Sequence, residues 1–408
     1  MKNLIIPLTA FLLIFFINAC KEKAPQQGWP EHIHVDPENL VEINRSDLLN
    51  LKKIIKLQDQ PLIGNIWGLI LGDEFMVTRS GQGVNLFDYD GNHIRSIGRA
   101  GRGPGEYLSL SGLAKIDTII RVLDRNQNRV VDFNVNGEFI ENHDAGGFGQ
   151  SYTHYKGLNF VYLGNELNEY NKRLLVYDES FSSLVFKDFS LDDIYHYMNM
   201  LNKTSFFKYK DSLRYLNPFN YNYIHNINVS GDSVTVEERY FLDFGPYETP
   251  KSFMERDWKH IGEFSDARDE AGYVIAPFDY SENDKYIIFV FRYTGINYLA
   301  VYSKETNKTI AIEKILDDIL FEGLKINAAD HWVPYYYDGD IVYQVIDAYE
   351  FIDNVSYVKE NMTTAEWESY SMKNPEVVEL YNSLDESDNP LIVVYELNPD
   401  FFSLVGAN

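Results

Sequence analysis

The chain has 408 residues, with 61 acidic and 36 basic side chains and a formal net charge of −25. So acidic a surface argues against nucleic acid as a partner, because that binding depends on Lys and Arg contacts with phosphate. Hydrophobic residues make up 45% of the chain, enough for a substantial core, and the 15% of aromatic residues favours β-strands.

Residues 1–19 have the order of a bacterial signal peptide. Lys2 supplies a positive start, and the apolar run 4–17 is shorter than the roughly 20 residues that a membrane-spanning helix needs. The run ends in a segment that resembles the lipobox of bacterial lipoproteins, Ile17-Asn18-Ala19-Cys20. An ordinary signal peptide followed by an incidental cysteine is the alternative.

Cys20 is the only cysteine of the sequence, so no disulfide within the chain can staple the fold. We therefore predict cleavage before Cys20 and lipidation of its thiol. Stable anchoring needs more than one acyl chain, and lipoproteins of this type carry two or three. The polar segment 20–35 is expected to be a lipid-anchored tether between the membrane and a folded domain at 36–408.

The sequence after the tether contains a repeat. Residues 84–94 match residues 130–140 at a constant offset of 46, with an Asp-Gly or Asn-Gly pair at the same place in each. Such pairs favour tight hairpins, because Gly and Asn accept a positive φ at little cost. Repeats of this length, built from short strands, are typical of propellers.

Six repeat units are expected, near residues 60–107, 108–150, 151–200, 215–255, 270–320 and 330–400. They predict an all-β fold, a six-bladed β-propeller with short helical insertions, in which residues 36–58 donate the strand that closes the ring. The insertions are expected at 192–210 and 364–384. Pro375 should divide the second into two short helices, because proline interrupts a helix.

One segment is specific enough to suggest a family, Gly101-Arg102-Gly103-Pro104-Gly105-Glu106-Tyr107. It resembles the G-x-G-P-G-E-Y signature of six-bladed β-propeller lipoproteins of Bacteroidota, in which it joins the first two blades. The resemblance implies a place in the cell envelope, on a membrane expected to be the outer one, facing the periplasm or the cell surface. It implies no settled activity, because fold alone does not give function.

The sequence contains no H-E-x-x-H pair and no G-x-S-x-G elbow, so no metal ligand, catalytic residue or cofactor is assigned. Residues 88–92 resemble the start of a calcium loop, but Arg99 occupies the position that needs a Glu ligand, and a hairpin turn explains the same residues. Binding is therefore expected rather than catalysis. The alternative, a glycan-active hydrolase or lyase, would place carboxylates, His or a metal at the mouth of the central channel.

Aromatic side chains supply the candidate ligand-binding residues, which are Trp332, Tyr335, Tyr336 and Trp367. Rings of Trp and Tyr stack on ligands, and their polar tips form hydrogen bonds. We expect some of the four to contact a glycan or protein ligand on the face that bears the 355–388 insertion. The alternative is that they pack this insertion onto the last blade. The predicted function is an envelope lipoprotein whose propeller binds a ligand or partner protein.

Overall fold

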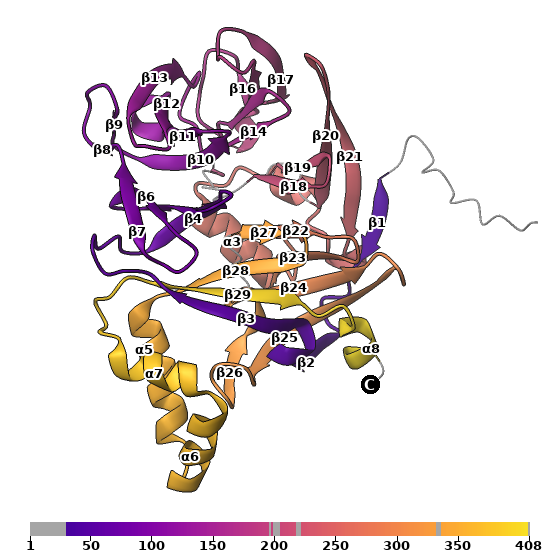
Figure 1. Ribbon diagram of the computed structural model, residues 1–408. Helices are drawn as coiled ribbons and strands as arrows, with labels where there is room; N and C mark the ends of the chain where they lie inside the picture. The colour runs from indigo at the N-terminus through magenta and orange to yellow at the C-terminus, as the bar shows by residue number, and fades with distance from the viewer. Residues whose placement is uncertain (1–29, 196, 199–204, 218–221, 332–335, 407–408) are drawn as a thin grey trace, which may run out of the picture.

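The computed structural model describes residues 30–195, 197–198, 205–217, 222–331 and 336–406. Within these ranges, six sheets contain four or more strands, and each has a four-stranded antiparallel core (Figure 1). A further sheet pairs only β8 (Arg99–Ala100) with β9 (Glu106–Tyr107). The predicted all-β propeller class is confirmed.

The first sheet holds β4 (Ile66–Leu71), β5 (Met76–Ser80), β6 (Gly83–Phe87) and β7 (His93–Ile97). The second holds β10 (Leu110–Ile116), β11 (Ile119–Asp124), β12 (Arg129–Asn134) and β13 (Phe139–Asp144). The third holds β14 (Ser151–Tyr155), β15 (Leu158–Tyr162), β16 (Lys172–Tyr177) and β17 (Leu184–Ser190).

The fourth sheet holds β18 (Phe206–Tyr209), β19 (Ser212–Leu216), β20 (Tyr223–Ser230) and β21 (Ser233–Asp243). The fifth holds β22 (Tyr280–Glu282), β23 (Tyr286–Tyr293), β24 (Ile296–Ser303) and β25 (Lys308–Asp317), with β26 (Leu324–Asn327) beyond β25. The sixth holds β27 (Tyr336–Asp338), β28 (Ile341–Ile346), β29 (Leu391–Leu397) and β3 (Leu49–Lys56).

The sheets follow one another around a common axis through their first strands. β4 contacts β10, β10 contacts β14, β14 contacts β18, β18 contacts β22, and β27 returns to contact β4. Every position of β6 and β15 is buried, because each of these strands lies in a sheet covered on both faces by its neighbours. The core therefore consists of apolar layers between successive sheets, such as the layer of Val77 and Val84 with Ile120 and Val131.

The N-terminal segment runs along the outer edges of three successive sheets (Figure 1). β1 (Glu31–His34) pairs in parallel with β21, β2 (Leu40–Asn44) pairs in parallel with β25, and β3 pairs antiparallel with β29. The prediction that residues 36–58 supply a closing strand is confirmed by β3. The predicted end of the tether at residue 35 is wrong, because pairing with β21 buries Ile33 completely and makes Glu31–His34 part of the folded domain.

The repeated hairpin turns are present with the same hydrogen bonds. The Asp88 Oδ1 atom accepts from the backbone amides of Asp90 and Asn92, at 2.9 and 2.8 Å. The Asn134 Oδ1 atom accepts from the corresponding amides of Asn136 and Glu138, at 2.9 and 3.0 Å. The turn interpretation of residues 88–92 is confirmed.

Helices occupy the connections between strands. α5 (Ala348–Glu360), α6 (Thr364–Lys373) and α7 (Pro375–Ser383) lie between β28 and β29, with the break at Pro375 as predicted. α5 was not predicted, and neither were α2 (Lys251–Met254) and α3 (Ile261–Glu270), which follow β21. In the 192–210 insertion, the described part has only a short 3-10 turn at Asp193–Tyr195 before β18.

Short helical segments complete the described chain, namely α1 (Arg45–Leu48), α4 (Ala328–His331), α8 (Phe401–Val405) and 3-10 turns at Arg125–Gln127 and Gly245–Tyr247. Among the helices in the described ranges, none has the length and apolar character needed to cross a membrane.

Strand order places the insertions on one face of the ring. In an antiparallel four-stranded sheet, the connection from second to third strand and the connection onward to the next sheet leave from the same face. The α5–α7 insertion is of the first kind, and residues 191–195 and 244–279 are of the second kind. We call this side the insertion face.

Candidate functional site

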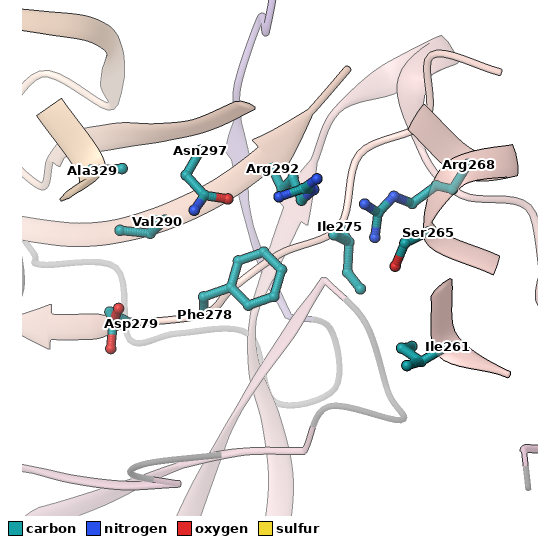
Figure 2. A pocket seen from close by; sticks show the side chains of 10 residues that line it. All are labelled: Ile261, Ser265, Arg268, Ile275, Phe278, Asp279, Val290, Arg292, Asn297 and Ala329. Carbon is teal, nitrogen blue, oxygen red and sulfur yellow. The ribbon is translucent and has the colours of Figure 1, made fainter. Parts of the chain in front are cut away.

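A pocket of about 540 Å³ lies on the insertion face beside the fifth sheet (Figure 2). Its walls come from α3, from the segment that leads into β22, from the β23–β24 hairpin and from α4. The lining residues are Ile261, Ser265, Arg268, Ile275, Phe278, Asp279, Val290, Arg292, Asn297 and Ala329. In Figure 2 the Phe278 ring lies in the middle, with Asn297 and Val290 on one side and Arg268 and Ser265 on the other.

Local structure explains how these elements meet. α3 begins at His260, whose side chain accepts a hydrogen bond from the Glu263 amide. The fully buried Phe264 fixes the helix in an apolar cluster with Phe253 and Trp258. The chain then runs antiparallel to β23, since Ile275 and Arg292 exchange backbone hydrogen bonds of 3.1 and 2.9 Å. The arginines of α3 and β23 thereby reach the same pocket.

Arg268 and Arg292 share the carboxylate of Asp269. Arg268 donates from Nε and Nη2 to the Oδ1 atom, and Arg292 donates from Nε and Nη2 to the Oδ2 atom, at 3.3 and 2.9 Å. Burial alone would raise the pKa of Asp269, but the hydrogen bonds from the two guanidinium groups lower it below its usual range. Asp269 is therefore ionised at neutral pH, and this trio carries one excess positive charge.

Several polar side-chain atoms of the pocket form no hydrogen bond with other described residues. Among the hydrogen bonds of the described residues, none uses the Nη1 atom of Arg268 or Arg292, the Asn297 amide group or the Ser265 hydroxyl group. Arg268 is only 2% exposed, whereas 34% of the Arg292 side chain is exposed. The pocket thus offers hydrogen-bond donors next to apolar walls. Its lining residues include neither His nor Cys, and Figure 2 shows the Ser265 hydroxyl and the Asp279 carboxylate on opposite sides of the Phe278 ring.

Asp132, Glu141 and His143 form a second polar group, with ligand atoms within 4.8 Å of one another. Both Asp132 oxygens already accept 2.6 Å hydrogen bonds from Arg121, whose positive charge opposes a cation at this place. The three residues lie on β12 and β13, the outer strands of the second sheet, rather than at the ring centre. These contacts indicate that Asp132, Glu141 and His143 take part in the packing of the second sheet.

The structure places only two of the five residues predicted from the sequence, because Cys20, Trp332 and Tyr335 lie outside the described residues. Tyr336 is half-buried in β27 and meets Tyr343 edge to face, at 6.0 Å between ring centroids. Trp367 is half-buried on α6 and stacks on Tyr370 at 5.3 Å.

Tyr336 and Trp367 do not form one surface. They pack against different apolar clusters, and Figure 1 shows α6 at the far end of the helical insertion, well away from β27. The contacts of Trp367 with Tyr370 and Tyr381 accord with the packing alternative. The role of the four aromatic residues in binding a ligand stays a prediction.

The sequence interpretation missed the arginine pair altogether. Arg268 and Arg292 belong to different elements, and neither is part of a recognisable motif. The sequence shows one arginine in an insertion and another in a strand of a strongly acidic chain, which does not indicate that the two meet.

The fold is that of a β-propeller protein with a ligand-sized pocket on its insertion face. The family described as "Domain of unknown function (DUF4934)" matches residues 31–396, and the chain therefore belongs to this family. The comparison with curated proteins found no relative.

Solved structures with a similar fold include a candidate exported protein from Bacteroides fragilis. It is 15% identical with a TM-score of 0.69, and the alignment covers 90% of this chain and 99% of that one. A member of the DUF4221 family from Bacteroides vulgatus is 10% identical with a TM-score of 0.47, covering 86% and 98% of the two chains. The WD40 domain of Neurospora crassa Pan2 is 11% identical with a TM-score of 0.36, covering 66% and 73%. The first likeness shows a shared fold.

Proposed function

We propose that this chain is an envelope lipoprotein whose six-bladed propeller binds a small ligand in the pocket between α3 and the fifth sheet, without converting it chemically. The observation that carries the proposal is a set of donors on Arg268, Arg292, Asn297 and Ser265 that lie in one concave site and bond to no acceptor in the described part of the chain. Ligand pockets of roughly 300–1,000 Å³ combine apolar walls with a few placed polar groups, and this pocket of about 540 Å³ has that character.

The location in the envelope rests on two observations. Residues 1–19 have the order of a signal peptide and lead to Cys20, the predicted lipid attachment site. The similarly folded protein from Bacteroides fragilis is described as exported. The glycine-rich segment 101–107 and the six sheets support a six-bladed propeller lipoprotein of Bacteroidota, and we propose that its anchor lies in the outer membrane.

Binding accounts for the geometry better than the glycan-active enzyme. Such an enzyme would need carboxylates or His acting together at the channel mouth. Among the described residues, the group that could hold a metal ion, Asp132, Glu141 and His143, lies on outer strands instead. The Asp132 carboxylate is also engaged by Arg121. A ligand or a segment of a partner protein that enters the pocket would meet the hydrogen-bond donors of Arg268, Arg292, Asn297 and Ser265.

The proposal is tested by filling the pocket. Ser265→Trp places an indole among the lining residues, and Asp266→Trp places the same group on the exposed side of α3 as a matched control. Thermal-shift screening with a library of neutral and charged fragments should give ligands that stabilise the native chain and Asp266→Trp but not Ser265→Trp. Fragment binding that persists unchanged in Ser265→Trp would place the ligand site elsewhere.

A further inference from the structure

Resting on the proposed pocket function, we infer that the pocket selects ligands with a single carboxylate group, bound against Arg268 and Arg292, and an apolar body. The contacts of the arginine pair, the charge balance of the walls and the apolar side chains lead to this class of ligand.

The arginine pair is preorganised for an oxyanion. Asp269 holds both guanidinium groups through their Nε and Nη2 atoms, which leaves each Nη1 atom without an acceptor in the described part of the chain. Guanidinium groups match the geometry of carboxylates, and hydrogen bonds between ionised groups are about twice as strong as neutral ones. Arg268 is almost wholly buried, so little side-chain entropy is lost when it binds.

Charge balance favours a monoanion. The two arginines and Asp269 together leave one excess positive charge on the arginine side of the pocket. A carboxylate neutralises this excess, whereas a phosphate monoester carries about −1.5 to −2 at pH 7 and would exceed it. Acidic side chains elsewhere on the surface have little effect on an anion in the pocket, because charges farther away than about 8 Å are largely screened at physiological salt.

The rest of the wall suits an apolar group. Ile261, Ile275, Phe278 and Val290 line the pocket, and Figure 2 shows the Phe278 ring between the arginine side and the Asp279 side. Apolar surface removed from water contributes roughly 25 cal/mol per Å², so a hydrocarbon body adds affinity that a small ion lacks. The Asn297 amide and the Ser265 hydroxyl remain available to orient the ligand.

Isothermal titration with matched probes tests the inference on the full chain purified in detergent. The probes are 3-phenylpropionate, its neutral amide 3-phenylpropionamide, and phenyl phosphate. We expect the acid to bind at least tenfold more tightly than the amide and more tightly than phenyl phosphate.

Two arginine variants test which guanidinium group causes the preference for the acid over the amide. Arg292→Gln should remove the preference for the acid. Arg239→Gln should keep it, because Arg239 has a similar exposure of 35% but lies on β21, pairs at 3.1 Å with Glu31 and does not line the pocket.

The outcomes separate this inference from the proposed function. Equal binding of acid and amide, lost in Ser265→Trp, would overturn selection of a carboxylate while leaving the pocket as a ligand site. Tighter binding of phenyl phosphate would overturn the monoanion assignment. A preference for the acid that survives in Arg292→Gln, or no binding of the acid at all, would overturn the inference.

Discussion

Asp132 lies directly opposite Arg121 in the antiparallel pair of β11 and β12, and its two oxygens each accept a 2.6 Å hydrogen bond from the guanidinium group. The Arg121 and Asp132 side chains are only 5% and 2% exposed. Arg121 also donates to Asn159 of the third sheet, so the ion pair links two neighbouring sheets.

We predict that Asp132→Ala lowers the free energy of unfolding by about 3–5 kcal/mol, because it leaves the buried Arg121 charge without its partner. Urea denaturation measures the change. The matched control is Asp90→Ala, which removes a 3.0 Å contact with Lys53 from a carboxylate that is 82% exposed, and should have little effect. Equal small losses in both variants would contradict a stabilising role for the Arg121 pair.

The same pair predicts a loss of stability in acid. Burial by itself would raise the pKa of Asp132, but hydrogen bonds from Arg121 and His143 lower it below its usual value. A group with a lowered folded-state pKa stabilises the fold above its unfolded pKa of about 3.9, and this contribution is lost as the pH falls through the folded-state value. The melting temperature should therefore fall below about pH 4, with a smaller fall in Asp132→Ala. Parallel curves for the two proteins would contradict this assignment.

A substitution at Ile33 tests where the folded domain begins. We predict that Ile33→Ala costs about 2–5 kcal/mol, the usual cost of truncating a buried Ile, because its side chain is fully buried in β1. His34→Ala, on the same strand but largely exposed, should leave the urea midpoint nearly unchanged. If both variants behaved like the native chain, residues 31–34 would act as part of the tether.

Gly105 tests the role of the glycine-rich segment. Its φ is +68°, and an added Cβ would lie 2.8 Å from the Cβ atom of Phe139. We predict that Gly105→Val lowers the melting temperature, with about 1–3 kcal/mol from backbone strain and a further cost from the clash. Gly231→Val, at φ +58° with open space around it, is the control for strain alone and should cost less. An unchanged melting temperature for Gly105→Val would argue against a structural role.

A substitution at Cys20 tests the predicted lipid anchor. We predict that Cys20→Ala abolishes labelling with a fatty-acid analogue and moves the protein from the membrane fraction to the soluble fraction, because stable attachment needs the acyl chains. Lys21→Ala, next to the attachment site, should still be labelled and retained. Retention of Cys20→Ala in washed membranes would rule out the lipid anchor.

Local signals in the sequence were sufficient for several of the strands and turns. The hairpins at Asp88 and Asn134 depend on a few adjacent residues, and so does the helix break at Pro375. Each of these features is decided by the conformational preferences of neighbouring residues, so it can be predicted without knowledge of the rest of the fold.

Tertiary structure alone decided which distant segments meet. The parallel pairing of β1 with β21 buries Ile33 in a stretch whose composition indicated a tether, and the burial of Arg268 beside Arg292 joins two elements with no shared motif. The Asp269 carboxylate accepts hydrogen bonds from both arginines, and its negative charge offsets the repulsion between the two guanidinium groups. Such contacts depend on how the whole ring closes, so they cannot be predicted from the sequence of any one segment.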